Sequence, residues 1–495
     1  MKRATIAAGV LAAVLALLAL AAVYRAGGPE VDRAAAPALA SAPVTGEGPD
    51  STAMSEMPDR EAAAGAAPRT EGVQQGFLYG RITTTGGARH EGRLRWGGDQ
   101  EAFWSDYFNG FKDENRWAAL VPPERLPVER HPIELFGWVL AQRERPAGLG
   151  RPFMARFGEI ARIEAVGGDV RVTLKNGTVF DLDRFEASDF DDGVRVWDAR
   201  GDAVDLDSLQ IRSIELLADP GVTGIPAASR RLHGTVRSRQ GDFTGFLQWN
   251  RRECLGSDEL DGRDAGGKTS LRFDALRAIA RRSEESSLVT LLDGREVVLS
   301  GSSEVGEGNL GIYVDDRRYG RVLVSWEAFE RVDFSPASPP GTGPAHGDFP
   351  PGHPLTGSVT TRDGRRLAGR LVFDLDESET TETLDAPSQG VDYTLPFGRI
   401  ASITLLSGIP RSAPSGPLAP SALSDSAERA APSVAVTLQS GETLELERAG
   451  DLGSANAGLL IFVDGGERPE YVPWSEVAQV DIDRTLKVER QLGAL

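Results

Sequence analysis

The sequence predicts an all-β protein. Its main body is expected to be six small β-barrel modules of about five strands each, arranged as three tandem pairs behind an N-terminal membrane-spanning helix and a disordered linker. Three observations predict this architecture. Two sequence patterns each occur three times, both have a glycine turn between alternating apolar and polar residues, and both lead to the same spacing of large apolar residues.

The N-terminus is expected to cross a membrane. Two basic residues precede an uncharged run at 4–24, and a third follows it. A helix rising about 1.5 Å per residue spans a hydrocarbon core of roughly 30 Å with this run. The apolar region of a cleaved signal peptide is usually shorter, but residues 19–21 form a small Ala-Leu-Ala site, so residues 1–25 are interpreted as a signal anchor or a signal peptide. The basic residues ahead of the run place the bulk of the chain outside the cytoplasm, in the periplasm or at the cell surface.

Three segments have the composition of disordered linkers. Residues 26–72 are mostly Ala, Pro, Gly, Ser and acids, and similar stretches occupy 336–354 and 408–432. Such segments bury too little apolar surface to fold. The folded regions that remain are 76–217, 231–335 and 355–482, and the last of them contains the linker at 408–432.

The first repeated pattern predicts a β-hairpin followed by an acidic loop. It reads LYGRITTTGGARHEGRLRW at 78–96, LHGTVRSRQGDFTGFLQW at 232–249 and LTGSVTTRDGRRLAGRLVF at 355–373. Alternation on both sides of a glycine turn is typical of a hairpin.

The second repeated pattern predicts another hairpin. It reads VTLKNGTVFDL at 172–182, VTLLDGREVVL at 289–299 and VTLQSGETLEL at 436–446. The Asn-Gly and Asp-Gly pairs in the first two copies are strong signals for a two-residue hairpin turn.

Both kinds of segment close with large apolar residues at intervals of three. This spacing predicts a single helical turn that leads into a final, inward-packing strand. The copies are Phe157-Ile160-Ile163, Ser208-Ile211-Ile214, Phe273-Leu276-Ile279, Trp326-Phe329-Val332, Phe397-Ile400-Ile403 and Trp474-Val477-Val480.

These elements resemble the Sm-like small β-barrels. The resemblance rests on the glycine-turn hairpin and the closing spacing, and it covers most of residues 76–482. It implies the fold alone, since fold does not imply function. A single module of about 50 residues buries too little surface to be stable by itself, so pairing is expected to enlarge each core.

Composition excludes several classes of function. The net charge is −19 and basic residues do not cluster, so nucleic acid is not an expected partner. Cys254 is the single cysteine, which excludes an intrachain disulfide and a cysteine metal cluster, and the five histidines lack ligand spacing. The chain also lacks a nucleophile elbow, a phosphate-binding glycine loop and a dinucleotide fingerprint, so no enzyme activity and no cofactor are expected.

The acidic loops could still bind a cation. Each contains an acid, four residues, a second acid, one residue, an apolar residue, and then Asn or Asp, starting at Glu101, Glu253 and Glu377. The third copy has the spacing of a calcium loop, through Asp374, Asp376, Ser378 and Asp385. However, Glu379 occupies the sixth place, where such a loop needs glycine.

The same acids have two other interpretations. They can cap loop amides or pair with arginines such as Arg251 and Arg252. Alternatively, two carboxyl groups in one pocket could serve as the acid and base of a hydrolase acting on envelope polysaccharide.

An aromatic insert at 113–150 is the one departure from the repeat. Insertions in repeat proteins often carry function, and aromatic side chains anchor protein and sugar partners. The candidate partner-binding residues here and just ahead of the insert are Trp104, Tyr107, Phe108, Trp117, Phe136 and Trp138. The alternative is a local core that seals the insert onto its own barrel.

Together these features favour a non-enzymatic, membrane-anchored binding or assembly scaffold of a bacterial-type envelope. Its expected partners are the membrane, through residues 4–24, and an envelope protein or polysaccharide. The alternative is a carboxylate- or metal-dependent hydrolase.

Overall fold

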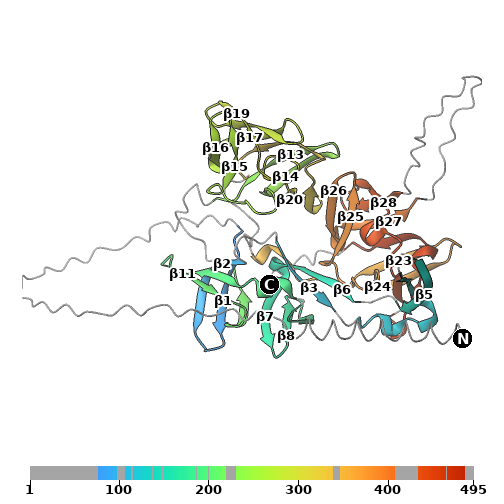
Figure 1. Cartoon of the computed structure of the whole chain (residues 1–495). Helices are drawn as coiled ribbons and strands as arrows, with labels where there is room; N and C mark the ends of the chain where they lie inside the picture. Colours follow the sequence, from blue (N-terminus) through green and yellow to red (C-terminus); the bar gives the residue numbers. More distant parts are fainter. Residues whose placement is uncertain are drawn as a thin grey trace, which may run out of the picture. The chain divides into compact units, whose positions relative to one another are not determined.

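The computed structural model is all-β, with strands as its main secondary structure (Figure 1). It describes residues 76–96, 106–112, 115–126, 128–135, 138–146, 150–185, 187–198, 200–218, 230–337, 346–406, 433–463 and 465–484. The prediction of an all-β chain is confirmed. The expected anchor at 4–24 and the linkers at 26–72 and 408–432 lie outside these residues. Within the described residues, no helix is long and apolar enough to cross a membrane.

Each predicted hairpin is present. The first pattern forms β1 (Tyr79–Thr84) with β2 (Arg89–Trp96), β13 (His233–Ser238) with β14 (Gly241–Gln248), and β23 (Thr356–Thr361) with β24 (Arg366–Val372). The second forms β8 (Asp169–Leu174) with β9 (Val179–Asp183), β18 (Ser286–Leu291) with β19 (Glu296–Ser300), and β28 (Ser433–Leu438) with β29 (Thr443–Glu447).

The closing spacing also has its predicted structure. A 3-10 turn holds the first aromatic residue of four copies, at Phe157–Glu159, Phe273–Ala275, Phe397–Arg399 and Trp474–Glu476. The closing strand starts at the next residue in each case. The six closing strands are β7 (Ile160–Val166), β12 (Ile211–Leu216), β17 (Leu276–Arg281), β22 (Phe329–Phe334), β27 (Ile400–Leu405) and β32 (Val477–Ile482).

The closing strands of each pair lie side by side. β7 pairs with β12, β17 with β22, and β27 with β32, all antiparallel. Ile163 faces Ile214 in the first of these ladders, and both side chains are fully buried. The centre of each repeat unit is therefore a ladder between its two halves.

The two halves of each pair also exchange their hairpins: the hairpin of each half continues its sheet or packs with strands of the other half. The predicted module of five strands contiguous in sequence is therefore wrong. β2 does not continue to β3 (Tyr107–Lys112); it pairs with β10 (Val194–Trp197), which is followed by β11 (Ala203–Leu206). Conversely, β8 turns back directly from β7 and pairs with it. β9 in turn lies beside β3, and β3 pairs with β6 (Arg151–Arg156).

The second and third pairs repeat this exchange. β14 pairs with β20 (Ile312–Asp316), next to β21 (Gly320–Val324), while β19 meets β15 (Glu259–Asp264), next to β16 (Gly267–Arg272). β24 pairs with β30 (Leu459–Val463), next to β31 (Glu470–Val472), while β29 lies beside β25 (Thr383–Ser388), which pairs with β26 (Val391–Pro396).

The described strands form open sheets, so the predicted closed barrels are wrong. The first pair has the order β11-β10-β2-β1-β12-β7-β8-β9. Because β12 and β7 pair with each other at the centre, this sheet runs on from one half to the other instead of closing on itself.

The repeated glycines permit the exchange. A Cβ atom on Gly92 would lie 1.7 Å from the carbonyl oxygen of Trp197 on β10. The equivalent contacts in the other pairs are 1.9 Å from Gly245 to Asp315 and 2.1 Å from Gly369 to Phe462. Only glycine lets the hairpin approach the strand from the other half this closely.

A hydrogen bond between the halves also occurs in all three pairs. A carboxylate from the second half accepts the backbone N–H of the Asn or Asp in the acidic-loop pattern. The pairs are Asn109 to Asp189 at 2.8 Å, Asp261 to Glu304 at 2.7 Å and Asp385 to Asp451 at 2.6 Å. In the first two pairs, the indole of Trp96 or Trp249 donates to the main-chain carbonyl of the same acidic residue.

The first pair has its own core, but the second and third pairs share one. β21 of the second pair continues into β26 of the third, with Val322 opposite Tyr393. The two pairs within 231–482 therefore do not bury separate cores. Strand pairing across the boundary places the apolar side chains of both regions on one sheet.

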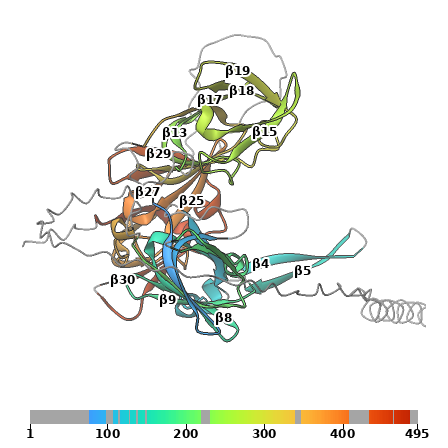
Figure 2. The ribbon, with the colours of Figure 1, turned by 90° about the vertical axis from the view of Figure 1, so that its left-hand side faces the viewer.

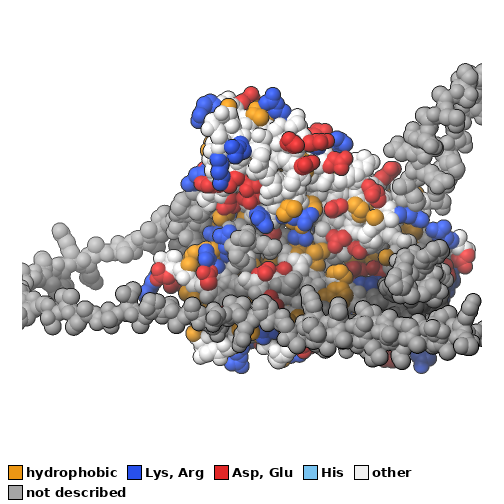
Figure 3. Space-filling model, in the orientation of Figure 1, with side chains coloured by type: hydrophobic (Ala, Val, Ile, Leu, Met, Phe, Trp, Pro, Cys, Tyr) orange, Lys and Arg blue, Asp and Glu red, His pale blue; other side chains and the backbone are white. Residues whose placement is uncertain are grey.

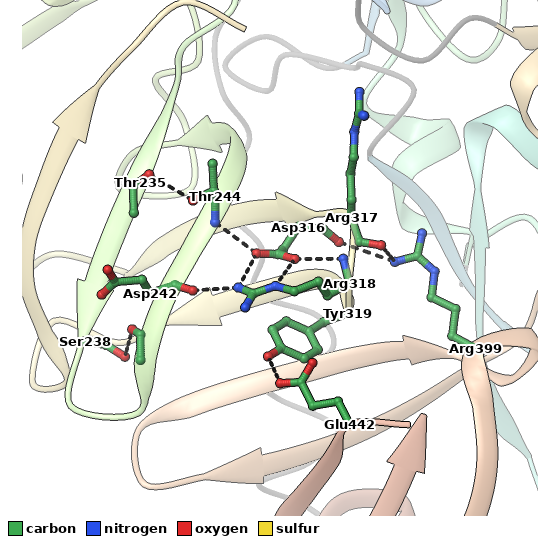
Figure 4. A network of polar contacts seen from close by, with 11 residues as sticks. Thr235, Ser238, Asp242, Thr244, Asp316, Arg317, Arg318, Tyr319, Arg399 and Glu442 are labelled. Carbon is green, nitrogen blue, oxygen red and sulfur yellow. Dashed lines mark hydrogen bonds and ion pairs between the residues drawn. The ribbon is translucent and has the colours of Figure 1, made fainter. Parts of the chain in front are cut away.

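Polar contacts reinforce this boundary (Figure 4). Arg318 and Asp316 form an ion pair at 2.9 Å, and Tyr319 donates to Glu442 of the third pair. Arg399 donates to the carbonyl of Arg317 at 2.9 Å. Since Asp316 is almost completely buried, the ion pair with Arg318 neutralises a charge that would otherwise be costly, and the other two bonds link the second pair to the third.

The predicted linker at 336–354 is partly ordered. Phe349 packs in the core of the first pair, against Gly158, and Lys175 donates to its carbonyl at 3.0 Å. Burial of Phe349, together with the hydrogen bonds from Lys175, attaches this end of the linker to the first pair.

We predict that Gly92→Ala lowers the stability of the protein. The new methyl group overlaps the Trp197 carbonyl, so β2 and β10 must separate, at a cost of roughly 1–3 kcal/mol. Thermal unfolding followed by circular dichroism measures the loss. Gly168→Ala is the matched control, because a Cβ there meets nothing within 4 Å; equal melting temperatures for the two variants would contradict the close approach.

Candidate functional site

The described aromatic residues just ahead of the insert belong to the core. Phe108 is fully buried, with its ring 5.8 Å from Trp96 and 6.1 Å from Phe157. Tyr107 is 4% exposed, and its hydroxyl accepts a 2.8 Å hydrogen bond from Arg156. Both side chains are therefore part of the core, and this burial does not favour the predicted role of Tyr107 and Phe108 in partner binding.

The Trp117 side chain also packs against other residues, but these belong to the third pair. Its ring meets Phe462 edge to face at 6.2 Å, and the guanidinium of Arg370 lies over both rings. Nearby, Asn115 donates to the carbonyl of Leu375 at 2.9 Å. A small core does seal this part of the insert, although onto the third pair and not onto its own module as expected.

The remaining aromatic candidates stay predictions. Trp104 and Phe136 lie outside the described residues. Trp138 begins β5 (Trp138–Pro146), which pairs with β4 (Val128–Leu135).

An acidic cavity lies where the first and third pairs meet. It has a volume of about 200 Å³ and is lined from β3 and β6 on one side and from the acidic loop at 374–385 on the other. Seven carboxyl groups and two basic groups line it: Glu159, Asp374, Asp376, Glu377, Glu382, Asp385 and Asp451, with Lys112 and Arg151.

Three of the four residues of the predicted calcium loop, Asp374, Asp376 and Asp385, line this cavity. Asp374 accepts from the N–H of Ala457 and lies 3.5 Å from Arg151, while Asp376 pairs with Lys112. Ser378 is buried. Asp385 is held through its amide by Asp451. Among the described residues, no group of three or more His, Cys, Asp and Glu side chains is placed to hold a metal ion.

Capping of loop amides is confirmed for two of the acidic loops. Glu382 accepts from the amides of Ser378 and Glu379, at 2.6 and 3.0 Å. Asp258 accepts from Cys254 and Leu255, both at 2.8 Å. The second acid of the pattern is thus a structural residue, which explains its fixed spacing.

The first acid of the pattern, in contrast, has a carboxylate oxygen without a hydrogen-bond partner in two of the loops. Glu377 remains partly accessible as a residue, but its Oε2 atom is buried and has no hydrogen-bond partner. Glu253 in the second pair has the same buried, unpartnered oxygen, although it does not line the acidic cavity. A buried carboxylate without a donor is costly unless it is protonated or meets a cation.

Burial is the main cause of raised pKa values around the cavity. It raises the pKa of Asp374 to about 6 and that of Glu159 to about 7. Burial followed by repulsion from neighbouring carboxylates also raises the pKa of Glu377 and of Asp451.

Lys112 partly offsets this negative charge. Burial lowers the pKa of its ammonium group, but the surrounding carboxylates, Asp376 first, outweigh burial and raise it. The group is therefore a cation held inside an acidic cavity. Lys112, Asp451 and Glu159 could not be recognised from the sequence as members of the site, because they come from segments far apart in the chain.

No protein-family model, curated protein or solved structure matches this chain.

We predict that stability falls as the pH rises from about 5 to about 8. The carboxyl pKa values are raised in the folded state, so the folded protein binds more protons than the unfolded chain in this window. Asp451→Asn keeps an oxygen for the Asp385 amide and removes one titrating group. It should reduce the loss of unfolding free energy between the two pH values by about 1–3 kcal/mol.

Chemical denaturation at both pH values measures this difference. Asp205→Asn is the control, because this exposed carboxylate pairs with Arg195 and its pKa is lowered. An unchanged pH dependence in Asp451→Asn would count against raised carboxyl pKa values at the cavity.

Proposed function

We propose that the chain is a non-enzymatic binding or assembly scaffold of a bacterial-type envelope, attached to the membrane through residues 4–24. The observation that carries the proposal is the β4–β5 hairpin. These two strands pair with each other and with no other strand of the described residues (Figure 2). In the rest of the described chain, strands are exchanged between halves and the second and third pairs share a core. These features favour a stiff support for the hairpin.

The hairpin is the part of the scaffold that meets a partner. A two-stranded ribbon is only marginally stable in water, and both of its edges carry unpaired backbone groups. An extended segment of a protein partner adds to such an edge through main-chain hydrogen bonds. Trp138, the first residue of β5, is of a residue type enriched at protein interfaces.

Surface charge supports a protein partner over nucleic acid. On the face shown in Figure 3, acidic and basic side chains of the described residues are interspersed. Many of the arginines are paired with carboxylates, as in Arg171–Asp181 and Arg195–Asp205. A continuous stripe of free basic side chains is what phosphate-backbone binding requires.

The hydrolase alternative rests on the acidic cavity. Glu377 and Glu382 both line it, and a buried carboxyl with a raised pKa is suited to act as a general acid. The scaffold is favoured because Glu382 already caps two amides. In addition, the matching acids Glu253 and Asp258 of the second pair lie outside this cavity. Release of soluble fragments from purified envelope polysaccharide, lost in Glu382→Gln, would favour the hydrolase.

We predict that replacing residues 127–147 with a short Gly-Ser linker abolishes partner binding without loss of stability. The hairpin forms its own sheet, so the other sheets keep their pairing. The measurement is cross-linking in native membranes, with identification of the envelope protein cross-linked to the wild-type chain, alongside the melting temperature.

Trp117→Ala is the matched control. It removes the contact with Phe462, so it should lower stability by roughly 0.5–3 kcal/mol while the hairpin still binds. Retained cross-linking in the hairpin replacement would refute the hairpin as the docking element.

A further inference from the structure

We propose that the acidic cavity between β3, β6 and the loop at 374–385 binds a small organic cation with a primary ammonium group. The proposal concerns a site separate from the β4–β5 hairpin and does not rest on the scaffold function. Its starting point is the buried Oε2 atom of Glu377, which lines the cavity without a hydrogen-bond partner.

The charge balance of the cavity favours a cation. Seven carboxyl groups and only two basic groups line a volume of about 200 Å³. Lys112 pairs with Asp376, and Arg151 lies 3.5 Å from Asp374. Neither basic group forms a hydrogen bond or ion pair with Glu377 among the described contacts. A bound cation would supply the missing partner in a region of low dielectric, where such a pair is strong.

The chemistry of the walls favours an alkylammonium ion. Phe153, Met154 and Phe180 line the same cavity and suit the methylene groups of an aliphatic amine. Lys112 is itself an alkylammonium group held among these carboxylates, and its Nζ atom lies 5.6 Å from the ring centroid of Phe180. A metal ion fits less well, because no described cluster of ligands is placed to coordinate one.

The ligand has a route to the cavity. A wider cleft of about 860 Å³ shares Lys112, Arg151, Phe180, Asp376 and Glu382 with it. This cleft adds Asp169, Asp181 and Asp183 to its walls, so acidic side chains continue from the cavity along β8 and β9. A diamine could place one ammonium group at Glu377 and the other in this cleft.

Isothermal titration calorimetry with putrescine tests the proposal on the full chain. The wild-type protein should bind the diamine, and Glu377→Gln should weaken binding at least tenfold because it removes the carboxylate with which a bound ammonium group would pair. The neutral analogue butanediol should not bind. Asp451→Asn, which removes a second carboxylate of the cavity, should also weaken binding.

Glu253→Gln is the matched control. Glu253 has the same place in the repeat and the same buried, unpartnered oxygen, but it lies outside this cavity, so its variant should bind putrescine like the wild type. Absence of putrescine binding to the wild type, or equal weakening in Glu253→Gln and Glu377→Gln, would overturn the proposal.

A calcium chloride titration separates the two kinds of cation. Calcium binding that depends on Glu377, in a protein that does not bind putrescine, would also overturn the ammonium site. Partner cross-linking by the hairpin should be unchanged in Glu377→Gln, so a failure here is distinguishable from a failure of the scaffold function.

Discussion

The antiparallel ladder between the two closing strands of each pair is the contact on which the rest of the fold depends. Once β7 and β12 lie side by side, β8 must turn back along β7, since only Gly167 and Gly168 separate them. The first hairpin is then left to pair with β10 and β12 of the other half. The same constraint explains why neither half has a complete core of its own.

The repeated hydrogen bond between the halves follows from this exchange. Once the hairpins have crossed, the short helix α2 (Ser188–Asp191) that follows β9 lies beside β3, and Asp189 accepts a hydrogen bond from the amide of Asn109. Glu304 and Asp451 repeat the contact in the other pairs. In the third pair this contact also places Asp451 beside other carboxylates, so the acidic cavity is partly a consequence of a structural bond.

The local elements could be predicted from the sequence, but their pairing could not. Glycine turns, alternation and intervals of three are signals within a few residues, and they located the hairpins and the turns before the closing strands correctly. Whether β2 continues to β3 or to β10 depends on contacts about a hundred residues away, which no local pattern records. The glycines were a partial signal of this pairing in the sequence. Gly92, Gly245 and Gly369 lie in strands and not in turns, and a glycine inside a strand often marks the close approach of another backbone.

The candidate site was predictable only in its acidic loop. The pattern identified Glu377 and Glu382, but not that Lys112, Asp451 and Glu159 would join them from three other segments.

The exchange of hairpins between the halves is tested most directly by cysteine cross-linking in a Cys254→Ser background. Arg95 faces Arg195 across β2 and β10, so Arg95→Cys with Arg195→Cys should form a disulfide under mild oxidation. If this pair forms no disulfide under conditions in which Arg81→Cys and Glu91→Cys, paired across β1 and β2, do form one, the result would contradict the exchange.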